Sequence, residues 1–226
     1  MGKISIWQRL LSYFKEIHIE SAPSELNPHL YVSLSKGRYM LSTAKAVYSH
    51  ADLYTNFGKV FDQVKFDQLP GQHCLILGLG LASIPILLEK RKQDLTYVAI
   101  EKDPNVIYLA SKYALPLIHS PLHIYEGDAL TLVQSQDDQS FDLICMDIFV
   151  DDVIPKSFRQ ASFVRQLARL ARSKGLIIIN VLKDKEGEKP INAQFREVLE
   201  THFPKGKVIE VGPNTMFVSD ERFLKG

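Results

Sequence analysis

The chain has 226 residues, with 27 basic and 26 acidic side chains and a formal net charge of +1 at pH 7. Its length predicts one large α/β domain, or a domain with a small appendage, and is ample for a sizeable core. The balanced charge argues against nucleic acid or a membrane surface as a partner.

The cysteines and the hydropathy pattern exclude further classes. Cys74 and Cys145 lie far apart within apolar runs, as expected of buried core thiols, and no Cys/His cluster predicts a metal site. No signal peptide is visible, and no apolar run reaches the roughly 20 residues that a membrane span needs. We therefore expect a cytoplasmic protein without a bound metal.

The first 70 residues have the pattern of a helix followed by short strands. Residues 6–14 are apolar at helical spacing, and residues 17–49 contain alternating strand patterns. Apolar residues at helical spacing follow from Ala51 to Phe66, which predicts a helix that packs on a sheet.

A linker at residues 69–71 predicts a boundary between a small N-terminal region, residues 1–70, and a second domain, residues 71–226. In the second domain apolar runs alternate with helical stretches, which predicts a parallel sheet with helices on both faces. The near-continuous apolar content of these runs is typical of strands that are covered on both sides. The expected strands lie within residues 74–80, 96–101, 122–128, 141–148, 175–182, 207–211 and 215–219, and the expected helices within residues 82–92, 103–114, 129–135, 157–171 and 191–201.

The last two expected strands flank Gly212-Pro213-Asn214, a turn sequence that predicts an antiparallel hairpin. The predicted fold class is therefore α/β: a doubly wound, mostly parallel Rossmann-like sheet with a terminal antiparallel hairpin, preceded by a small N-terminal β-region. Such a sheet binds ligands beyond the carboxyl ends of its strands, where the strand order reverses.

Polar residues or glycines follow three of these strands and predict a nucleoside site. Gly78 and Gly80 stand between a strand and a helix, where glycine lets a ligand approach the backbone. Glu101 ends the next strand, where a carboxylate can accept hydrogen bonds from both ribose hydroxyls. Asp128 follows the third strand and could accept one from an adenine amino group. For both acids the alternative is a carboxylate that stabilises a helix N-terminus.

Three aspartates follow the expected strand FDLICM, which has the apolar content of a strand buried on both faces. Asp147 stands at the strand end itself, and Asp151 and Asp152 follow within six positions. Crowded carboxylates repel one another and resist desolvation, so we expect them to face a cationic ligand. For Asp151 and Asp152 a solvated loop that caps the next helix is an equal alternative.

The absence of a third glycine from the loop after the first strand of the second domain indicates which class of nucleoside to expect. A dinucleotide enzyme usually carries a third glycine where Ser83 stands. The third strand-end acid and the terminal hairpin instead favour proteins that bind S-adenosylmethionine or its relatives.

With these motifs the chain resembles spermidine synthase and the wider group of polyamine aminopropyltransferase-like proteins, which have a class I methyltransferase-like fold. AIEKDPNVI is similar to the family's acidic strand end, EGDAL to its Gly-Asp-Ala segment and MDIFVDDVIP to its catalytic loop. The resemblance implies that Glu101 holds the ribose, Asp128 faces the adenine and Asp147 is the catalytic aspartate. RYMLSTAKAVYSHADLY is similar to the stretch ending in the family's Tyr-His-Glu, which implies that Tyr54 approaches the substrate amine.

The reaction implied by the resemblance is an in-line displacement at a sulfonium carbon. An ammonium with a pKa of about 10.4 must first lose a proton, which Asp147 would accept. Asp151 or Asp152 would bind the distal ammonium of a diamine. We thus expect decarboxylated S-adenosylmethionine or S-adenosylmethionine as co-substrate, a polyamine or other cationic amine as second substrate, and a homodimer.

Three segments differ from the family's motifs. Leu81 replaces the aspartate that would hold the aminopropyl ammonium, and one extra position precedes Asp151 in the catalytic loop. Thr55 and Asn56 follow Tyr54 where the family has His and Glu. Two alternatives therefore stay open: an S-adenosylmethionine-dependent methyltransferase of a small molecule, and a non-catalytic relative that binds a nucleoside.

Overall fold

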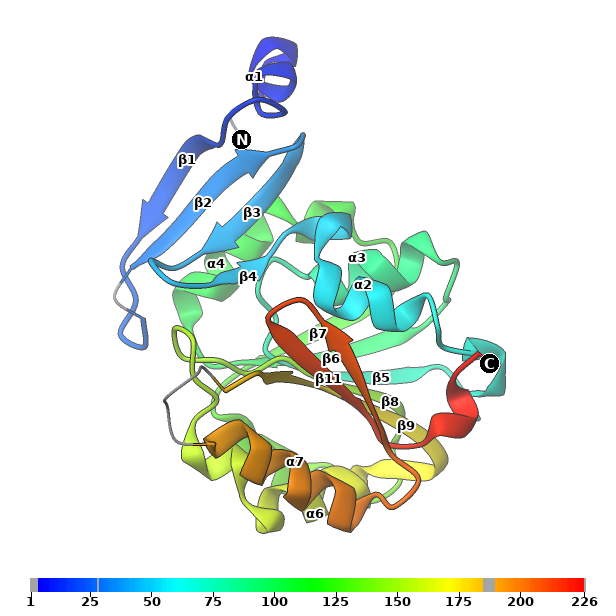
Figure 1. Cartoon of the computed structure of the whole chain (residues 1–226). Helices are drawn as coiled ribbons and strands as arrows, with labels where there is room; N and C mark the ends of the chain where they lie inside the picture. Colours follow the sequence, from blue (N-terminus) through cyan, green and yellow to red (C-terminus); the bar gives the residue numbers. More distant parts are fainter. Residues whose placement is uncertain (1–3, 28, 185–189, 226) are drawn as a thin grey trace.

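The computed structural model describes residues 4–27, 29–184 and 190–225 and contains two sheets (Figure 1). A four-stranded antiparallel sheet has the order β1-β2-β3-β4, and a seven-stranded sheet has the order β10-β11-β9-β8-β5-β6-β7. Strands β5 to β9 pair in parallel, whereas β11 runs antiparallel to both β9 and β10. The predicted α/β class, with its terminal hairpin and its N-terminal β-region, is confirmed.

The N-terminal part forms the small sheet and the helices that flank it. A turn with positive φ at Lys36 and Gly37 joins the two central strands. The short helix α1 projects from the molecule, and none of its side chains is buried (Figure 1). The bounds are α1 (Ile6–Leu11), β1 (Ile17–Ala22), β2 (Leu30–Ser35), β3 (Arg38–Ser42), β4 (Val47–Ser49) and α2 (Thr55–Phe61).

Strands and helices then alternate along the chain, as the sequence predicted. Because β6 and β7 lie on one side of β5 and β8 and β9 on the other, the strand order reverses between β5 and β8. The bounds are β5 (His73–Leu77), α3 (Ser83–Lys90), β6 (Thr96–Glu101), α4 (Pro104–Tyr113), β7 (Leu122–Glu126), α5 (Ala129–Leu132), β8 (Phe141–Met146), α6 (Ala161–Leu170), β9 (Ala171–Leu182), α7 (Ile191–His202), β10 (Lys207–Val211) and β11 (Asn214–Val218).

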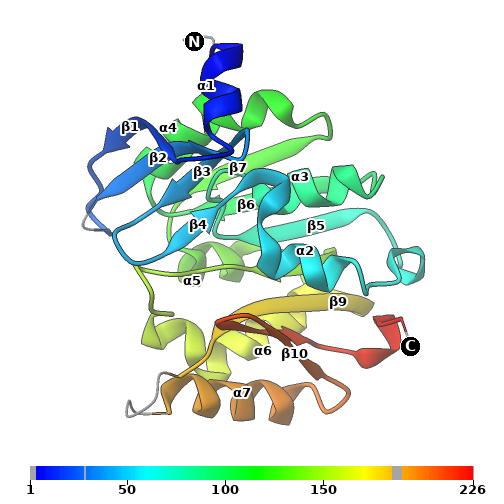
Figure 2. The same ribbon diagram turned by 45° about the horizontal axis from the view of Figure 1, so that its top comes forward.

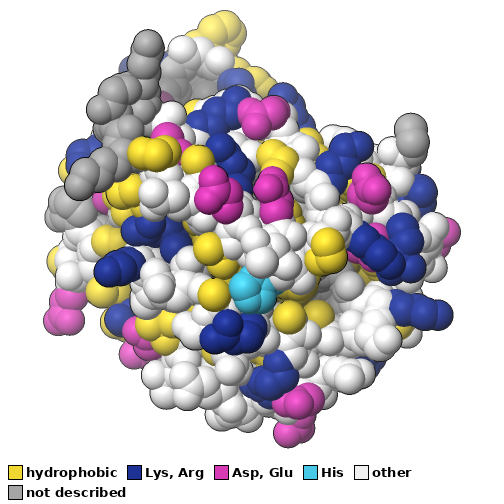
Figure 3. Space-filling model, turned by 60° about the horizontal axis from the view of Figure 1, so that its bottom comes forward, with side chains coloured by type: hydrophobic (Ala, Val, Ile, Leu, Met, Phe, Trp, Pro, Cys, Tyr) yellow, Lys and Arg dark blue, Asp and Glu magenta, His cyan; other side chains and the backbone are white. Residues whose placement is uncertain are grey.

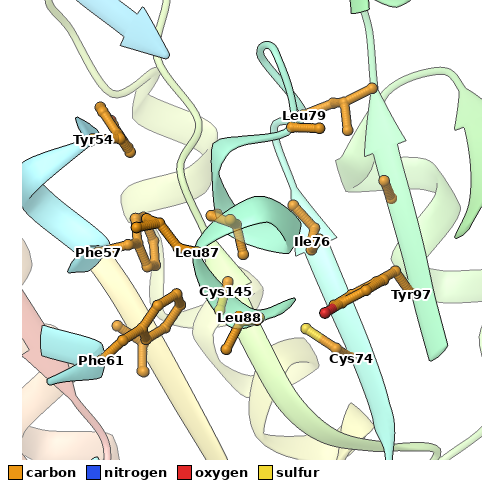
Figure 4. Close-up of a cluster of buried hydrophobic side chains, with 14 of the residues drawn as sticks. Tyr54, Phe57, Phe61, Cys74, Ile76, Leu79, Leu87, Leu88, Tyr97 and Cys145 are labelled. Carbon is orange, nitrogen blue, oxygen red and sulfur yellow. The ribbon is translucent and has the colours of Figure 1, made fainter. Parts of the chain in front are cut away.

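Two apolar clusters cover the two faces of the large sheet. Figure 4 shows the first, in which Phe57 of α2 and Leu87 of α3 pack with Ile76 and Cys145. The second joins α6 and α7 to the opposite face. All six residues of β8 are buried. Leu143 and Cys145 enter the first cluster and Ile144 and Met146 the second, because successive side chains of a strand point to opposite faces. The buried Asp142 is paired with Arg172.

Two predicted helices are interrupted by a residue with an extended backbone. The segment from Ala51 to Phe66 is interrupted at Tyr54, whose backbone is extended and whose side chain turns toward the large sheet. The helix expected over residues 157–171 begins only at Ala161, because the extended backbone of Gln160 separates it from a preceding 3₁₀ turn. Both interruptions lie close to the carboxyl edge of the large sheet.

The small sheet lies beside α4 of the second domain (Figure 2). Glu20 accepts hydrogen bonds from Lys112 (2.6 Å) and from the Tyr113 hydroxyl, at the end of α4, and the Ser24 hydroxyl donates to Asp103 (2.5 Å). Because Asp103 follows the carboxyl end of β6, the segment after β1 borders the carboxyl edge of the large sheet. The boundary at residue 70 stays a prediction.

The surface carries charges of both signs. On the face in Figure 3, basic and acidic side chains are interspersed, in keeping with the net charge of +1. Within residues 4–27, 29–184 and 190–225, no helix has the length and apolar content to cross a membrane.

Candidate active site

A cavity of about 270 Å³ lies at the carboxyl edge of the large sheet, where the strand order reverses. Five of the predicted site residues line it: Gly78, Gly80, Glu101, Asp128 and Asp147. They come from four separate strand ends, as the ligand-binding rule for doubly wound sheets predicts. The N-terminal region closes one side of the cavity through Leu26, Asn27 and Tyr48.

The glycine loop after β5 is tightly enclosed. Gly78 has a φ of 90°, and a Cβ atom there would overlap the carbonyl oxygen of Asp147. The Asp147 amide donates to the carbonyl of Leu77 at 2.8 Å, so the end of β8 passes directly over this loop. Gly80 also has a positive φ, of 52°, and a Cβ atom there would lie 3.2–3.3 Å from Ser49 and the carbonyl oxygen of Tyr48, a tight contact but not an overlap. The close approach of backbone therefore requires glycine at residue 78.

Glu101 is held in one orientation by three backbone amides. Its Oε2 accepts from Leu79 (2.9 Å), and its Oε1 accepts from Lys102 (2.8 Å) and Asp103 (2.9 Å). Burial raises the pKa of Glu101, and these amides limit the rise. The N-cap of α4 is Asp103, and Glu101 accepts from its amide, so the carboxylate of Glu101 also lies close to the start of this helix.

Asp128 both caps a helix and lines the cavity. Its Oδ1 accepts from the amide of Leu130 at 2.9 Å, at the start of α5, and its Oδ2 lies 2.8 Å from Lys102 Nζ. Partial burial raises the pKa of Asp128, but Lys102 and the Leu130 amide outweigh it, so the pKa lies below its usual value. Asp128 is therefore a fixed, charged acceptor.

Asp147 is part of a buried polar network on the face of the sheet that carries Tyr54. Its Oδ1 accepts from Asn180 Nδ2 at 2.8 Å and from the Tyr54 hydroxyl at 3.3 Å. Burial raises the pKa of Asp147 from 3.8 to about 6, against the lowering effect of these two donors. Burial and the Asp147 carboxylate raise the pKa of Tyr54, which keeps its hydroxyl protonated.

Two asparagines in this network were missed in the sequence analysis. Asn180 lies at the end of β9, and its Oδ1 accepts from Asn214 Nδ2, on β11, at 2.8 Å. The available signal was Asn180 itself, a polar residue that interrupts the apolar run of β9. No comparable signal pointed to Asn214, which follows a turn.

Asp151 is bound by the N-terminal region. Its carboxylate accepts from the Thr43 hydroxyl at 2.7 Å and lies 3.0 Å from Lys45 Nζ. Its amide donates to Asn27 Oδ1 at 3.0 Å. Neither Asp151 nor Asp152 is among the residues that line the cavity, and their role in substrate binding stays a prediction.

Leu81, at the position of the family's ammonium-binding aspartate, lies in the apolar core with 1% of its surface exposed. The cavity walls are also largely apolar, with Ile148, Phe149 and Phe158 among the lining side chains. Such walls suit a flat nucleobase. Within the described ranges, no group of three or more His, Cys, Asp or Glu residues is arranged to hold a metal ion.

Comparisons with known proteins bear on the family resemblance and on the fold. No protein-family model matches the chain. A polyamine aminopropyltransferase from Vibrio vulnificus is 26% identical over 132 residues, which are 56% of this chain and 43% of that protein. The chain thus matches less than half the length of this curated relative.

Solved structures share the fold. A probable spermidine synthase from Corynebacterium glutamicum superposes with a TM-score of 0.69 at 16% identity, over 90% of this chain and 79% of that one. A spermidine synthase in complex with the transition state analogue AdoDATO gives 0.68 at 12% identity, over 89% and 71%. Human methyltransferase-like protein 13 in complex with SAH gives 0.60 at 17% identity, over 75% and 81%.

The chain has a methyltransferase-like α/β fold. Among proteins with this fold, the curated relative is a polyamine aminopropyltransferase, and two of the three solved structures are named as spermidine synthases. The resemblance to the spermidine synthase-like family is therefore confirmed.

Proposed function

We propose that the protein is a spermidine synthase-like transferase that moves an aminopropyl group from decarboxylated S-adenosylmethionine to a polyamine. Asp147 carries the proposal: a carboxylate with a pKa of about 6 lines the same cavity as Glu101 and Asp128. The sequence match to a polyamine aminopropyltransferase supports the same reaction class.

In the proposed reaction the amine nitrogen forms a bond to the carbon beside the sulfonium. The carbon–sulfur bond breaks, and its electron pair stays on sulfur, which leaves the neutral thioether methylthioadenosine. The amine proton passes to Asp147, which is mostly ionised at pH 7. The adjacent sulfonium also lowers the pKa of the incoming amine through like-charge repulsion.

Asp147 has one oxygen available for this proton. Both of its hydrogen bonds, from Asn180 and Tyr54, fall on Oδ1. Among the described residues none donates to Oδ2, and the side chain is partly exposed toward the cavity. We therefore assign Oδ2 as the proton acceptor.

The charge of the cavity supports a cationic ligand. Four carboxylates line it, from Glu101, Asp103, Asp128 and Asp147, against one cation, Lys102. The Lys102 ammonium is already paired with Asp128. An excess of negative charge in a partly apolar cavity favours a sulfonium donor and an amine acceptor.

Calorimetric titration with decarboxylated S-adenosylmethionine, S-adenosylmethionine and methylthioadenosine, the last with and without putrescine, tests the proposal. We expect the decarboxylated donor to bind more tightly than S-adenosylmethionine, and putrescine to strengthen the binding of methylthioadenosine. Absence of binding by all three compounds would contradict any function that uses this donor class.

A second candidate function is a methyltransferase of a small molecule, and burial of Leu81 favours it. Residue 81 is a buried leucine and offers no carboxylate to an aminopropyl ammonium. Methyl transfer does not require an aminopropyl group to be bound in this place. Tighter binding of S-adenosylmethionine than of its decarboxylated form would decide for this candidate. Nucleoside binding with neither aminopropyl nor methyl transfer would decide for a non-catalytic relative.

Glu101→Gln is expected to weaken nucleoside binding about 10- to 100-fold, because ribose hydroxyls lose a charged acceptor. The Gln side chain also has only one acceptor oxygen, whereas the two oxygens of Glu101 accept from three backbone amides. Calorimetry with methylthioadenosine measures the effect. Glu126→Gln is the matched control, since Glu126 pairs with Glu101 in the sheet but does not line the cavity. Equal affinities of the two variants would contradict the ribose assignment.

We further propose a homodimer whose interface includes α1. Trp7 and Phe14 expose 80% and 90% of their surface, and Ile6 exposes 78%. Exposed apolar groups of this density mark interaction sites.

Light scattering is expected to give twice the mass of one chain for the wild type and one chain mass for Trp7→Glu/Phe14→Glu. Leu117→Glu, at an exposed apolar residue elsewhere, should remain dimeric; a monomeric wild type overturns the proposal.

A further inference from the structure

We infer that Asn214 is a positioning residue that acts on Asp147 through the side chain of Asn180. The inference deepens the proposed function, since it rests on Asp147 as the proton acceptor. It assigns a role to a residue of the terminal hairpin, which contributes no side chain to the cavity lining.

The three side chains form a line across three neighbouring strands. Asn214 on β11 donates to Asn180 on β9 at 2.8 Å, and Asn180 donates to Asp147, directly after β8, at 2.8 Å. The exposed fraction is 1% for Asn180 and 7% for Asn214, so water does not compete strongly for either amide. Each donor in the line points toward the carboxylate.

Asn214 fixes the acceptor end of the Asn180 amide, while its donor end faces Asp147 and lies 3.5 Å from the Tyr54 hydroxyl, which also donates to Asp147. An amide has a donor end and an acceptor end. If the Asn180 amide were turned round, its carbonyl oxygen would face the Asp147 carboxylate and its NH₂ group would face the NH₂ group of Asn214. The first contact is unfavourable while Asp147 is ionised, and the second is unfavourable in either state of Asp147. Asn214 therefore opposes the turned orientation even when Asp147 is protonated.

This orientation favours the ionised form of Asp147. Burial raises the pKa of the carboxyl to about 6, and the hydrogen bond from Asn180 is the larger of the two lowering effects. Once the Asn180 amide can rotate, its carbonyl can accept a hydrogen bond from protonated Asp147. Loss of Asn214 therefore stabilises the protonated form, in which Asp147 cannot act as a base.

A purely structural role would not require amides here. Positions 177–179 and 181 of β9 and 216–218 of β11 are apolar and buried. A pair of apolar side chains could fill this space without partners, whereas buried amides are costly unless they are hydrogen-bonded. The polar pair is thus explained by the carboxylate at its end.

The test is the titration of Asp147 by ¹³C NMR of aspartate-labelled protein without substrate, with the resonance assigned by its loss in Asp147→Asn. In Asn214→Ala the Asp147 pKa is expected to rise by about one unit. Asn180→Leu should raise it at least as much, and adding Asn214→Ala to Asn180→Leu should raise it no further, because Asn214 acts through Asn180. The acid limb of kcat/KM should shift equally, with a loss of about twofold near pH 7 and about tenfold at pH 5.

Thr215→Val is the matched control. Thr215 is the next residue of β11 and is fully buried, and its hydroxyl has no hydrogen-bond partner among the described residues. Removal of this hydroxyl should leave the Asp147 titration unchanged. Asn214→Leu, which keeps the branched shape of the side chain but removes its polar atoms, replaces Asn214→Ala should the latter fail to fold.

The outcomes separate this inference from the proposed function. An unchanged Asp147 pKa in the folded Asn214 variants, or an additive shift in the double variant, overturns the positioning role even if the transferase is active. A shifted pKa that passes through Asn180 supports the positioning role, because the NMR titration requires no turnover. A wild type without transferase activity would then overturn only the proposed function.

Discussion

Asp147→Asn is expected to reduce aminopropyl transfer by about 10²- to 10⁴-fold, the usual contribution of a general base. The amide keeps the shape of the carboxyl group and can still accept from Asn180 and Tyr54, but it cannot take a proton. Binding of methylthioadenosine should change little, since Glu101 and Asp128 are untouched. Steady-state assays with decarboxylated S-adenosylmethionine and putrescine measure the loss.

The same substitution is expected to stabilise the fold. The pKa of folded Asp147, about 6, lies above the usual value of 3.8. Its contribution to stability is therefore fully present below pH 3.8 and is lost as the pH rises through 6. At pH 7 the amide avoids this loss, which is on the order of 3 kcal/mol, and the melting temperature should rise by about 6–12 °C.

Thermal melts at pH 4 and pH 7 test this expectation. The difference in melting temperature between variant and wild type should be present at pH 7 and close to zero at pH 4. Asp137→Asn, at an exposed carboxylate, should show no such dependence. An Asp147→Asn variant that keeps transferase activity would show that Asp147 is not the general base. A variant that is less stable than the wild type at pH 7 would show that the ionised carboxylate does not destabilise the fold.

Leu81→Asp is expected to destabilise the protein by about 3–5 kcal/mol at pH 7, rather than to create an ammonium site. The side chain has 1% of its surface exposed and belongs to the apolar cluster beneath α2 and α3. A carboxylate there would be dry and without a cationic partner. Because burial would raise the pKa of the new carboxyl group, its cost should be smaller at pH 4 than at pH 7.

Denaturant unfolding measures this cost. Leu81→Met is the control, because a swap that conserves volume in a packed core costs less than about 1.5 kcal/mol. Tighter binding of decarboxylated S-adenosylmethionine by a stable Leu81→Asp variant would contradict the structural argument. It would mean that residue 81 reaches the ligand.

The elements of the fold and the outline of its site could be read from the sequence. The apolar runs of β5, β6, β8 and β9 and the helices between them follow from local periodicity, which any window of the sequence contains. Gly78, Glu101, Asp128 and Asp147 were identifiable because each stands where an apolar run ends. In a parallel sheet all such ends meet at one edge.

The contacts between distant residues were decided only by the tertiary structure. Asn214 reaches Asn180 because β11 pairs antiparallel with β9, and Thr43 and Lys45 reach Asp151 because the small sheet leans over the cavity. Tyr54 reaches Asp147 only because the chain breaks a predicted helix at that residue.

The burial and the charge state of a side chain are also decided only by the tertiary structure. A carboxylate in a sequence carries no record of its desolvation or of its hydrogen-bond donors, and these two factors set the pKa of Asp147 near 6. The sequence by itself determined which residues end each strand, because periodicity is a local property. Only the folded chain decided which of them share a hydrogen bond, because strand order and packing bring together residues more than 100 positions apart.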